Sequence, residues 1–356
     1  MKNIRKIIVT VLIPVFMLGN VPVFSEGEVR IGTTYSQVQS AYLELDDKET
    51  YLLTLEEGFD LVRLGSYWNE IEKEKDVYDF SALDWQLSKA EEKNVSVVLT
   101  VGMKAPRWPE YFIPDWVMKK ASFSFGKDVS KNAYLRERTL KFIKEVVERY
   151  KNKEIIKYWQ VENEALNKFG GDFWYIGKEF LREEITLVRE LDGGKRKIVL
   201  TAATYPNSFL RFFADISVKH DPIEENLAMC DVLGLNVYPI VGHKTWGLRF
   251  YFRTGEKGRQ KYFSRLLDRI KEKGKKAWII EFQAEPWEPG RLVYTDKAPP
   301  ITARALEMEK TLDEFLSMGF KTILLWGSEY WQFRKGEYKD EKWILAVRRI
   351  LRRAGK

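Results

Sequence analysis

Cysteine and histidine are nearly absent from this 356-residue sequence, which contains one cysteine, Cys230, and two histidines, His220 and His243. One cysteine excludes an internal disulfide bond and a Cys-rich metal site, and a buried, inert thiol is its expected state. Two separated histidines do not supply the ligand cluster of a metal-dependent barrel enzyme. The sequence also lacks the nucleophile-elbow motif that a Ser-His-Asp hydrolase needs. We therefore expect an activity that uses no metal ion and no cofactor.

The sequence also lacks a concentrated basic arm, an RNP-like motif and zinc-finger spacing, so nucleic acid is not an expected partner. Lys and Arg number 59 against 52 Asp and Glu, and the two signs are mixed along the chain as on a solvated surface. Aromatic residues are plentiful, with 12 Trp and 17 Tyr. Many of them are expected to fill the core, but flat amphipathic rings also suit the apolar faces of sugars.

The first 25 residues are typical of an export signal, with a basic start followed by an apolar run over 7–18 and small residues near Ser25. This run is short for a membrane span, which needs about 20 apolar residues. A membrane anchor that is not cleaved is the alternative. In either case we expect residues 26–356 to form one domain outside the cytoplasm, secreted or anchored to the membrane.

Eight short apolar runs alternate with longer segments of helical periodicity in the rest of the chain. Strands buried on both faces and separated by helices indicate a parallel sheet, and eight such units fit a closed (β/α)8 TIM barrel of the α/β class. The first unit is the weakest, because its helix near 48–58 is poorly periodic. The predicted strands are 29–34, 61–64, 95–101, 155–161, 197–202, 232–237, 277–280 and 322–326, and the clearest helices are 81–93, 132–150, 173–191, 257–273, 302–318 and 342–353.

Two connections are long, residues 102–131 after the third strand and 282–301 after the seventh. Long loops inside a compact domain are usually functional, and the loops that follow the strands of a barrel build its active face. Chemistry is therefore expected at the ends of the strands.

Glutamates end two of the predicted strands. The fourth strand ends in Glu162-Asn163-Glu164, and the seventh runs into Glu281. An apolar strand does not hold a carboxylate in its interior without cost, so these side chains are expected to face the mouth. Hydrolysis of a glycosidic bond needs one carboxylic acid to protonate the leaving oxygen and a second carboxylate to attack or to activate water. Glu164 and Glu281 are the candidate pair.

An ionised nucleophile needs a cation or hydrogen-bond donors beside it, whereas the acid needs a raised pKa. Arg63, at the end of the second strand, is the candidate cation, and Tyr238, after the sixth strand, is the candidate hydrogen-bond donor. Both sit at strand ends of the same predicted barrel as the two glutamates.

With these residues in place, the sequence resembles the clan A glycoside hydrolases. This retaining (β/α)8 superfamily includes family 5 cellulases and mannanases and family 42 β-galactosidases. The resemblance rests on Asn163-Glu164 ending strand four and on Glu281 in Trp-Ile-Ile-Glu-Phe ending strand seven. It implies that Glu164 is the acid/base, that Glu281 is the nucleophile, and that Asn163 binds the sugar 2-hydroxyl.

Further positions extend the resemblance over nearly the whole chain after the leader. Arg63 and Tyr238 match the strand-two arginine and strand-six tyrosine of the clan, and Trp326 in Leu-Leu-Trp-Gly matches the tryptophan that floors the subsite of the cleaved sugar. The segments VRLGSYWNEIEKEKDVYDFSALD and VGMKAPRWPE are also similar to the clan. The sequence departs from family 5 in its histidines, and Lys104 stands where a histidine is expected.

Other side chains near the strand ends have two interpretations. Glu162 is a second candidate acid, but alternation along the strand turns it away from the side of Glu164. Glu285 and Glu329 follow the seventh and eighth strands and are expected to form structural ion pairs rather than to bind sugar. The tryptophans after the strands stack on sugars or pack between loops, and His243 is expected to be a loop residue. These tryptophans are Trp68, Trp108, Trp174, Trp287 and Trp331, of which Trp68 and Trp108 are candidate substrate-binding residues.

The sequence thus favours a retaining β-glycoside hydrolase that acts on a β-linked oligo- or polysaccharide. A transglycosylase would use the same two glutamates. A non-catalytic carbohydrate-binding barrel would lack one of the two carboxylates, and both are present.

Overall fold

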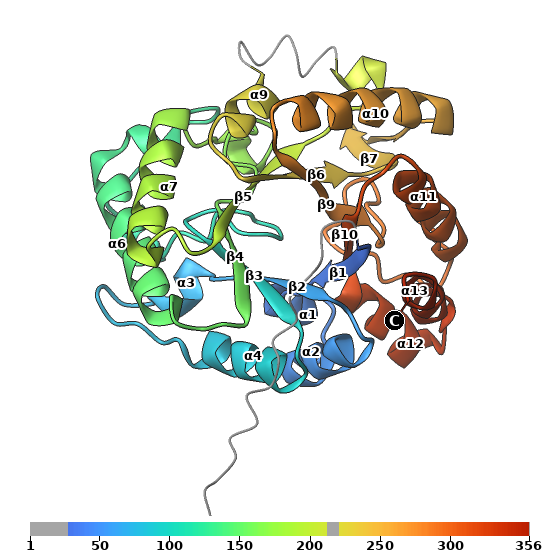
Figure 1. Ribbon diagram of the computed structural model, residues 1–356, viewed down its shortest axis with the longest axis horizontal. Coiled ribbons are helices and arrows are strands. Elements are labelled where there is room, and N and C mark those ends of the chain that lie inside the picture. The colour runs from blue at the N-terminus through green and yellow to red at the C-terminus, as the bar shows by residue number, and fades with distance from the viewer. Residues whose placement is uncertain (1–27, 212–220, 356) are drawn as a thin grey trace, which may run out of the picture.

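Eight parallel strands form a closed barrel in a computed structural model that describes residues 28–211 and 221–355. Around the barrel the strands follow the order β1-β10-β9-β6-β5-β4-β3-β2, and the helices form a ring outside them (Figure 1). The barrel strands are β1 (Arg30–Thr34), β2 (Leu61–Gly65), β3 (Ser96–Val101), β4 (Ile156–Val161), β5 (Lys197–Ala203), β6 (Val232–Val237), β9 (Lys276–Gln283) and β10 (Thr322–Trp326).

The outer helices turn an apolar stripe toward the barrel. In α7, Phe180, Leu181, Ile185 and Val188 are buried at a spacing of three to four residues, and Gly193 ends the helix in a left-handed conformation. The outer helices are α2 (Asp47–Glu56), α4 (Ser81–Glu92), α6 (Ala133–Tyr150), α7 (Lys178–Asp192), α10 (Glu256–Glu272), α11 (Ala305–Ser317) and α13 (Lys342–Arg353). Shorter helices in the connections are α1 (Gln37–Tyr42), α3 (Trp68–Ile71), α5 (Asp115–Met118), α9 (Pro222–Leu227) and α12 (Ser328–Tyr338), with the 3-10 turns η1 (Val129–Lys131) and η2 (Gly171–Phe173).

The barrel interior is packed with side chains. One apolar cluster draws its members from six different strands, as expected of side chains that point inward around a closed barrel. The larger core cluster lies between the strands and the outer helices. The interior cluster consists of Leu61, Val98, Val199, Val232, Trp278, Ile280 and Leu324. A filled interior leaves only the ends of the strands for chemistry.

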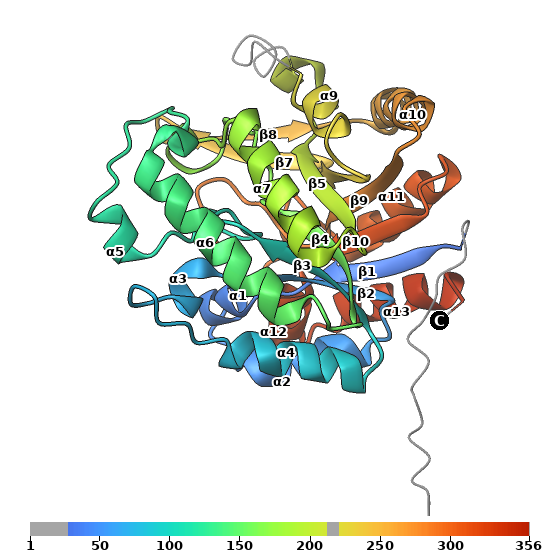
Figure 2. The ribbon, with the colours of Figure 1, turned by 60° about the vertical axis from the view of Figure 1, so that its left-hand side comes forward.

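All eight predicted strands and the six clearest helices are confirmed, within a few residues at their ends. The helix expected from residue 173 begins at Lys178, because η2 precedes it. The sequence did not indicate α12, which is buried along residues 328–334 and so lacks an amphipathic period. It also did not indicate an antiparallel ribbon after β6, formed by β7 (Ile240–Thr245) and β8 (Leu248–Arg253), which lies beside the barrel (Figure 2).

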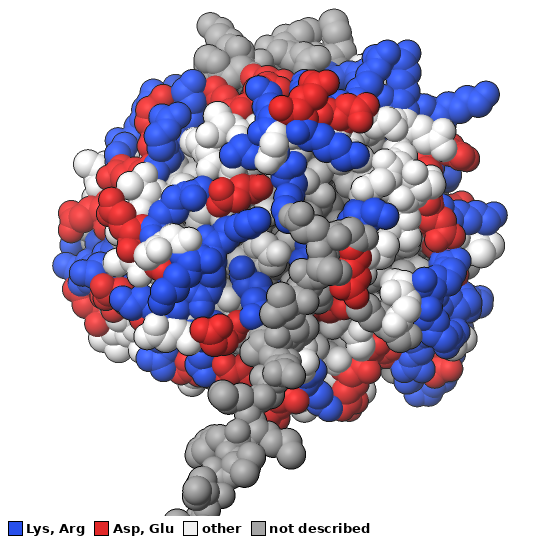
Figure 3. Space-filling view, in the orientation of Figure 1, with Lys and Arg blue, Asp and Glu red and all other residues white. Residues whose placement is uncertain are grey.

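Cys230 is buried, and burial raises the pKa of its thiol to about 12, as expected of an inert cysteine. Side chains of both charge signs are interspersed on the face shown in Figure 3. The predicted export segment, residues 1–25, lies outside the described residues. Among the helices that the structure describes, none is long and apolar enough to cross a membrane.

Candidate active site

The Glu281 carboxylate, on β9, is held by two donors from other strands. Arg63 on β2 donates from Nη2 to Oε1 at 2.7 Å, and the Tyr238 hydroxyl, one residue after β6, donates to Oε2 at 2.8 Å. Arg63 is fully buried, so the ion pair is shielded from solvent. Burial and the charge of Glu281 raise the pKa of Tyr238 well above its ordinary value, which keeps the phenol protonated as a donor. These contacts favour an ionised Glu281.

Glu164 follows β4 and is held by two amides instead of a cation. Asn236 on β6 donates to Oε1 at 2.6 Å, and Asn167 donates to Oε2 at 2.7 Å. Burial and the nearby charge of Glu281 raise the pKa of Glu164 to about 7. Two carboxyl groups at one barrel mouth therefore have opposite preferences, since Glu281 is paired with a cation and Glu164 retains a proton near neutrality.

An ion pair with one fully buried partner contacts the main chain of Glu164. Lys104, in the loop after β3, is fully buried and pairs with Glu110 at 3.0 Å. Its Nζ also donates to the main-chain carbonyl of Glu164 at 3.1 Å. The positive charge of Lys104 lowers the pKa of Glu164, and the negative charge of Glu110 raises it. This loop both orients the candidate acid and adjusts its proton affinity.

Asn163 is fixed through its side-chain oxygen. That oxygen accepts hydrogen bonds at 3.2 Å from Gln160 Nε2 and from the Thr201 hydroxyl, and the same hydroxyl accepts from the Glu164 backbone N–H at 2.7 Å. The amide nitrogen of Asn163 donates to no other described residue. It is therefore oriented at the mouth with its donor available.

Glu162 points away from Glu164, as the alternation of the strand predicts. It is fully buried, and its two oxygens accept the backbone N–H groups of Met103 and Lys104 at 2.8 and 2.6 Å. Glu184 of α7 is buried against it. Two carboxylates cannot hydrogen-bond to each other, so the Glu184 oxygens have a partner only when a proton lies between the two groups. Burial raises both pKa values, that of Glu162 to about 7.

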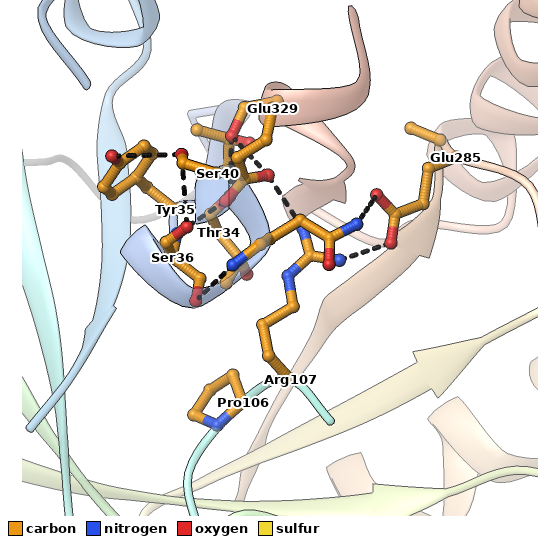
Figure 4. Close-up of polar contacts among 12 residues, drawn as sticks. Thr34, Tyr35, Ser36, Ser40, Pro106, Arg107, Glu285 and Glu329 are labelled. Atoms are coloured by element: carbon orange, nitrogen blue, oxygen red, sulfur yellow. Dashed lines mark hydrogen bonds and ion pairs between the residues drawn. The ribbon is translucent and has the colours of Figure 1, made fainter. Parts of the chain in front are cut away.

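Arg107 crosses the mouth to two carboxylates on other loops (Figure 4). It pairs with Glu285 and, at 2.8 Å, with Glu329, and its guanidinium lies 3.9 Å from the centre of the Trp326 ring. Glu329 also accepts the Ser36 backbone N–H at 2.5 Å. Glu285 and Glu329 therefore form the structural ion pairs expected from the sequence, and Arg107 joins the loops after the first, third, seventh and eighth strands of the barrel.

The tryptophans divide into two groups. Trp68 is a correction to the sequence analysis: its side chain is fully buried, stacks on Phe142 at 5.3 Å and donates to Glu72, so it cannot reach a sugar. Trp331 is likewise in the core. By contrast, Trp108 and Trp287 are each about half exposed, and the Trp287 ring lies 5.0 Å from that of Tyr238. Trp108 and Trp287 thus lie on the surface, with Trp287 beside the ring that contacts Glu281.

The structure adds site residues that the sequence analysis did not identify as such. Asn236 and Asn167 hold Glu164, and Arg107 braces the loops. Asn236 had a visible signal, because it lies two residues before Tyr238 and so on the same side of the strand. Within residues 28–211 and 221–355, no group of three or more His, Cys, Asp and Glu side chains is placed to hold a metal ion. His243 was expected in a loop, but it lies on strand β7, where it is exposed.

A family model matches part of the chain. Residues 44–177 match the model of glycoside hydrolase family 42, described as β-galactosidase. The matched segment contains Arg63, Asn163 and Glu164 and ends before Tyr238 and Glu281. No sequence among the curated proteins matches the chain.

Solved structures share the fold. The β-galactosidase of the haloarchaeon Halorubrum lacusprofundi matches with a TM-score of 0.56 and 14% identity, over 89% of this chain and 57% of that one. Xylanase 10B of Thermotoga maritima matches with a TM-score of 0.56 and 18% identity, over 92% and 95%. A GH5_18 protein of Streptomyces cattleya gives 0.60 and 13%, over 93% and 82%.

The chain spans just over half the length of the first β-galactosidases that it matches. At these identities the structural matches show the fold alone. Together with the family match they confirm the resemblance to the clan A TIM-barrel glycosidases.

Proposed function

We propose that this chain, which has the clan A glycoside hydrolase fold, is a retaining hydrolase of β-linked oligo- or polysaccharides. One observation carries the proposal. Glu281 is held by Arg63 and Tyr238, while the neighbouring Glu164 lacks a cation on its carboxyl group and has a pKa raised to about 7. This is the division of labour that a nucleophile and a general acid need.

The reaction takes two steps. In the first, a Glu281 oxygen bonds to the anomeric carbon as the bond to the glycosidic oxygen breaks, and Glu164 gives its proton to that leaving oxygen. In the second, Glu164 takes a proton from water, whose oxygen attacks the anomeric carbon and displaces Glu281. Glu164 ends protonated and Glu281 ends as a carboxylate. Two inversions give net retention of configuration.

The contacts of the site explain why the roles are not exchanged. Attack by Glu281 requires a negative charge on its oxygens, and Arg63 stabilises that charge. Tyr238 donates to the second oxygen and can keep that bond after the first has become an ester oxygen. Asn163 presents its amide donor beside Glu164, where a hydroxyl of the cleaved sugar would bind.

The proposal is tested by Glu281→Gln, which is similar in size to the native residue and cannot form the ester. On an activated aryl β-glycoside we expect kcat to fall by several orders of magnitude. The variant should still fold, with a lower melting temperature, because the buried Arg63 loses its counter-charge. Glu272→Gln, the same change on the exposed end of α10, is the matched control and should turn over normally. Appreciable activity of Glu281→Gln in the absence of contaminating enzyme would contradict the nucleophile assignment.

Stereochemistry gives a second test of the mechanism. In the wild-type protein, proton NMR of the first product formed should show the β anomer before mutarotation, because two displacements restore the starting configuration. An initial α anomer would mean a single displacement by water. In that case Glu281 would be a general base rather than a nucleophile.

Hydrolysis and transfer to a second sugar use the same two glutamates and the same covalent intermediate. Glu164 lines a pocket of about 920 Å³ whose wall includes exposed residues such as Lys261 and Arg265, so either water or an acceptor sugar can reach the acid/base. Product analysis with and without an added acceptor sugar distinguishes the two outcomes, since a transglycosylase would give mainly lengthened products.

A further inference from the structure

The pocket that Glu164 lines lies on the side of the barrel formed by the ends of β4 and β5, helix α9 and helix α10. Its volume is about 920 Å³, enough for more than one sugar residue. Neither Glu281 nor its partners Arg63 and Tyr238 contribute to the wall. The pocket therefore extends from the acid/base away from the nucleophile.

This position assigns the pocket to the leaving group. The nucleophile bonds to the anomeric carbon of the sugar that is retained, whereas the acid protonates the oxygen that departs with the rest of the substrate. A space that begins at Glu164 and continues away from Glu281 receives the part beyond that oxygen. The assignment to the leaving group rests on the proposed function, whereas the binding site itself is defined by its lining residues alone.

The lining is strongly basic. Among the described lining residues, six side chains are Lys or Arg, and the carboxylates are Glu164 and Asp221. Asp221 is already paired with Arg269, which also contacts Glu224. The basic residues are Lys168, Arg211, Arg253, Lys261, Arg265 and Arg269.

Helix α10 supplies three of these cations in one stripe. Lys261, Arg265 and Arg269 are spaced four residues apart and lie along the pocket. Like charges at this spacing repel each other and destabilise a helix. Among the described residues no carboxylate forms an ion pair with Lys261 or Arg265, although the chain elsewhere pairs many of its surface cations. Lys261 and Arg265 therefore carry positive charge with no ion-pair partner among the described residues into a concave site, where a bound anion would neutralise it.

The pocket is also connected to the acid/base. The Tyr205 hydroxyl donates to Asn167 Oδ1 at 3.3 Å, and the same Asn167 donates to Glu164. Tyr205 and Tyr262 place aromatic rings in the wall, which suits sugar rings. A ligand in the pocket thus contacts the exposed cations and also reaches Glu164, the proton donor, which lines the same pocket.

We propose that this basic pocket binds an anionic sugar unit on the leaving-group side of the substrate, carrying a carboxylate or a sulfate ester. A neutral sugar would stack on the aromatic rings and hydrogen-bond to Asn167, but it would not neutralise the charges of the Lys and Arg side chains. An acidic unit uses both, because Arg and Lys bind carboxylate and sulfate oxygens with charge-assisted hydrogen bonds. The proposal therefore names an acidic glycan as the substrate class.

Equilibrium binding to the Glu281→Gln protein tests this without any turnover. Calorimetric titrations compare tetrasaccharides of glucuronate and of galacturonate with the neutral glucose and galactose tetrasaccharides and with their O-sulfated forms. Acidic forms should bind at least about tenfold more tightly than neutral ones at low salt, and the advantage should shrink as salt rises. The carboxylate and sulfate arms distinguish the two sources of negative charge.

The double variant Lys261→Gln/Arg265→Gln should lose most of that advantage while its affinity for neutral oligomers stays the same. Lys144→Gln/Arg352→Gln, which removes the same charges from exposed positions on α6 and α13, is the matched control and should keep it. Equal affinity for acidic and neutral oligomers, or an undiminished preference in the pocket variant, overturns the proposal. Because the readout is binding, it stands apart from whether Glu281 is the nucleophile.

Discussion

At the scale of single residues, burial and the charge of Glu281 raise the pKa of Glu164, and two opposite charges in one loop adjust it further. Lys104 lowers the pKa of Glu164 and Glu110 raises it, and burial brings the result to about 7. The acid must be protonated when the glycosidic bond breaks. Turnover of a substrate with a poor leaving group should therefore decline as the pH rises through about 7.

Substitutions of this ion pair should move that decline in opposite directions. Lys104→Gln removes the positive charge, so the pKa of Glu164 rises and the alkaline limb of kcat/KM moves to higher pH. Glu110→Gln removes the negative charge and should move the limb to lower pH. A shift of half a pH unit or more is expected for each, as is usual for a charge within a few ångströms. Shifts of the same sign in both would show that the variants act by distorting the loop.

Glu164 itself should show a dependence on the leaving group. Glu164→Ala removes the proton donor, which a nitrophenolate hardly needs and a sugar hydroxyl needs strongly. We expect a loss of kcat/KM that is at least about a hundredfold larger for the poor leaving group. Rates on both substrates, measured with the same protein preparation, provide the comparison. An equal loss on the two would remove Glu164 from the acid/base role.

The residues of the site were predictable to different degrees. Glu164, Glu281, Arg63 and Tyr238 could be identified because each is a polar residue at the end of an apolar strand, and strand ends converge in a barrel. Arg107 could not, because its partners Glu285 and Glu329 are far from it in the sequence and only the folded chain brings them together. Trp68 was placed wrongly, since position after a strand does not say whether a ring faces the mouth or the core.

At the scale of elements, α7 is tied to the loop after β3 through a shared proton. Glu162 holds the Met103 and Lys104 N–H groups, and Glu184 of α7 lies against Glu162. Gly102, with φ of +118°, makes room, because a Cβ there would lie 2.1 Å from a Glu162 oxygen. The loop that carries Lys104 is thus positioned from behind by a buried pair of carboxyl groups.

This pair should make stability depend on pH. In the unfolded chain the two groups lose their protons near their ordinary pKa of 4.5, whereas in the folded state burial raises the pKa of Glu162 to about 7 and that of Glu184 well above 4.5. Over that range the folded state binds more protons, so the free energy of unfolding falls as the pH rises from about 4.5 to 7. Glu184→Gln keeps a donor toward Glu162 without a titrating proton.

We expect Glu184→Gln to reduce the fall in unfolding free energy between pH 5 and 8 by on the order of 2 kcal/mol, because one buried titration is removed. Urea unfolding at the two pH values measures this. Glu183→Gln, on the adjacent and exposed position of α7, should leave the difference as it is in the wild type. A steeper fall in Glu184→Gln would mean that Glu184 is ionised in the folded protein.

The strands and outer helices were predictable because their periodicity is determined by burial against one barrel. The β7–β8 ribbon was not predicted, because most of its residues are exposed and β7 has no apolar alternation, although Leu248, Phe250 and Phe252 alternate with other residues in β8. Helix α12 was not predicted for the opposite reason, since burial on all sides removes the polar face by which a helix is recognised in a sequence. Local patterns thus indicate helices that have one buried face and strands that form short, continuous apolar runs.

At the scale of the whole molecule, the barrel is closed by the pairing of β1 with β10. Arg30 lies opposite Thr322, and its guanidinium donates to the Thr322 hydroxyl at 2.7 Å and to the Tyr158 hydroxyl at 3.2 Å. β1 also pairs with β2. The described barrel therefore begins at residue 30, a few residues after the segment predicted to direct export.

A chain that begins at Glu28 should consequently fold and turn over substrate like the full-length chain, with a melting temperature within about 2 °C, because every strand pair of the barrel is retained. It should also remain inside the producing cell, whereas the full-length chain should be recovered outside the cytoplasm, as we propose for residues 1–25. A chain that begins at Ser36 is the control: it lacks β1, leaves β2 and β10 as open edges, and should not unfold cooperatively. Export of the chain that begins at Glu28 would show that the export signal lies within the barrel and not in residues 1–25.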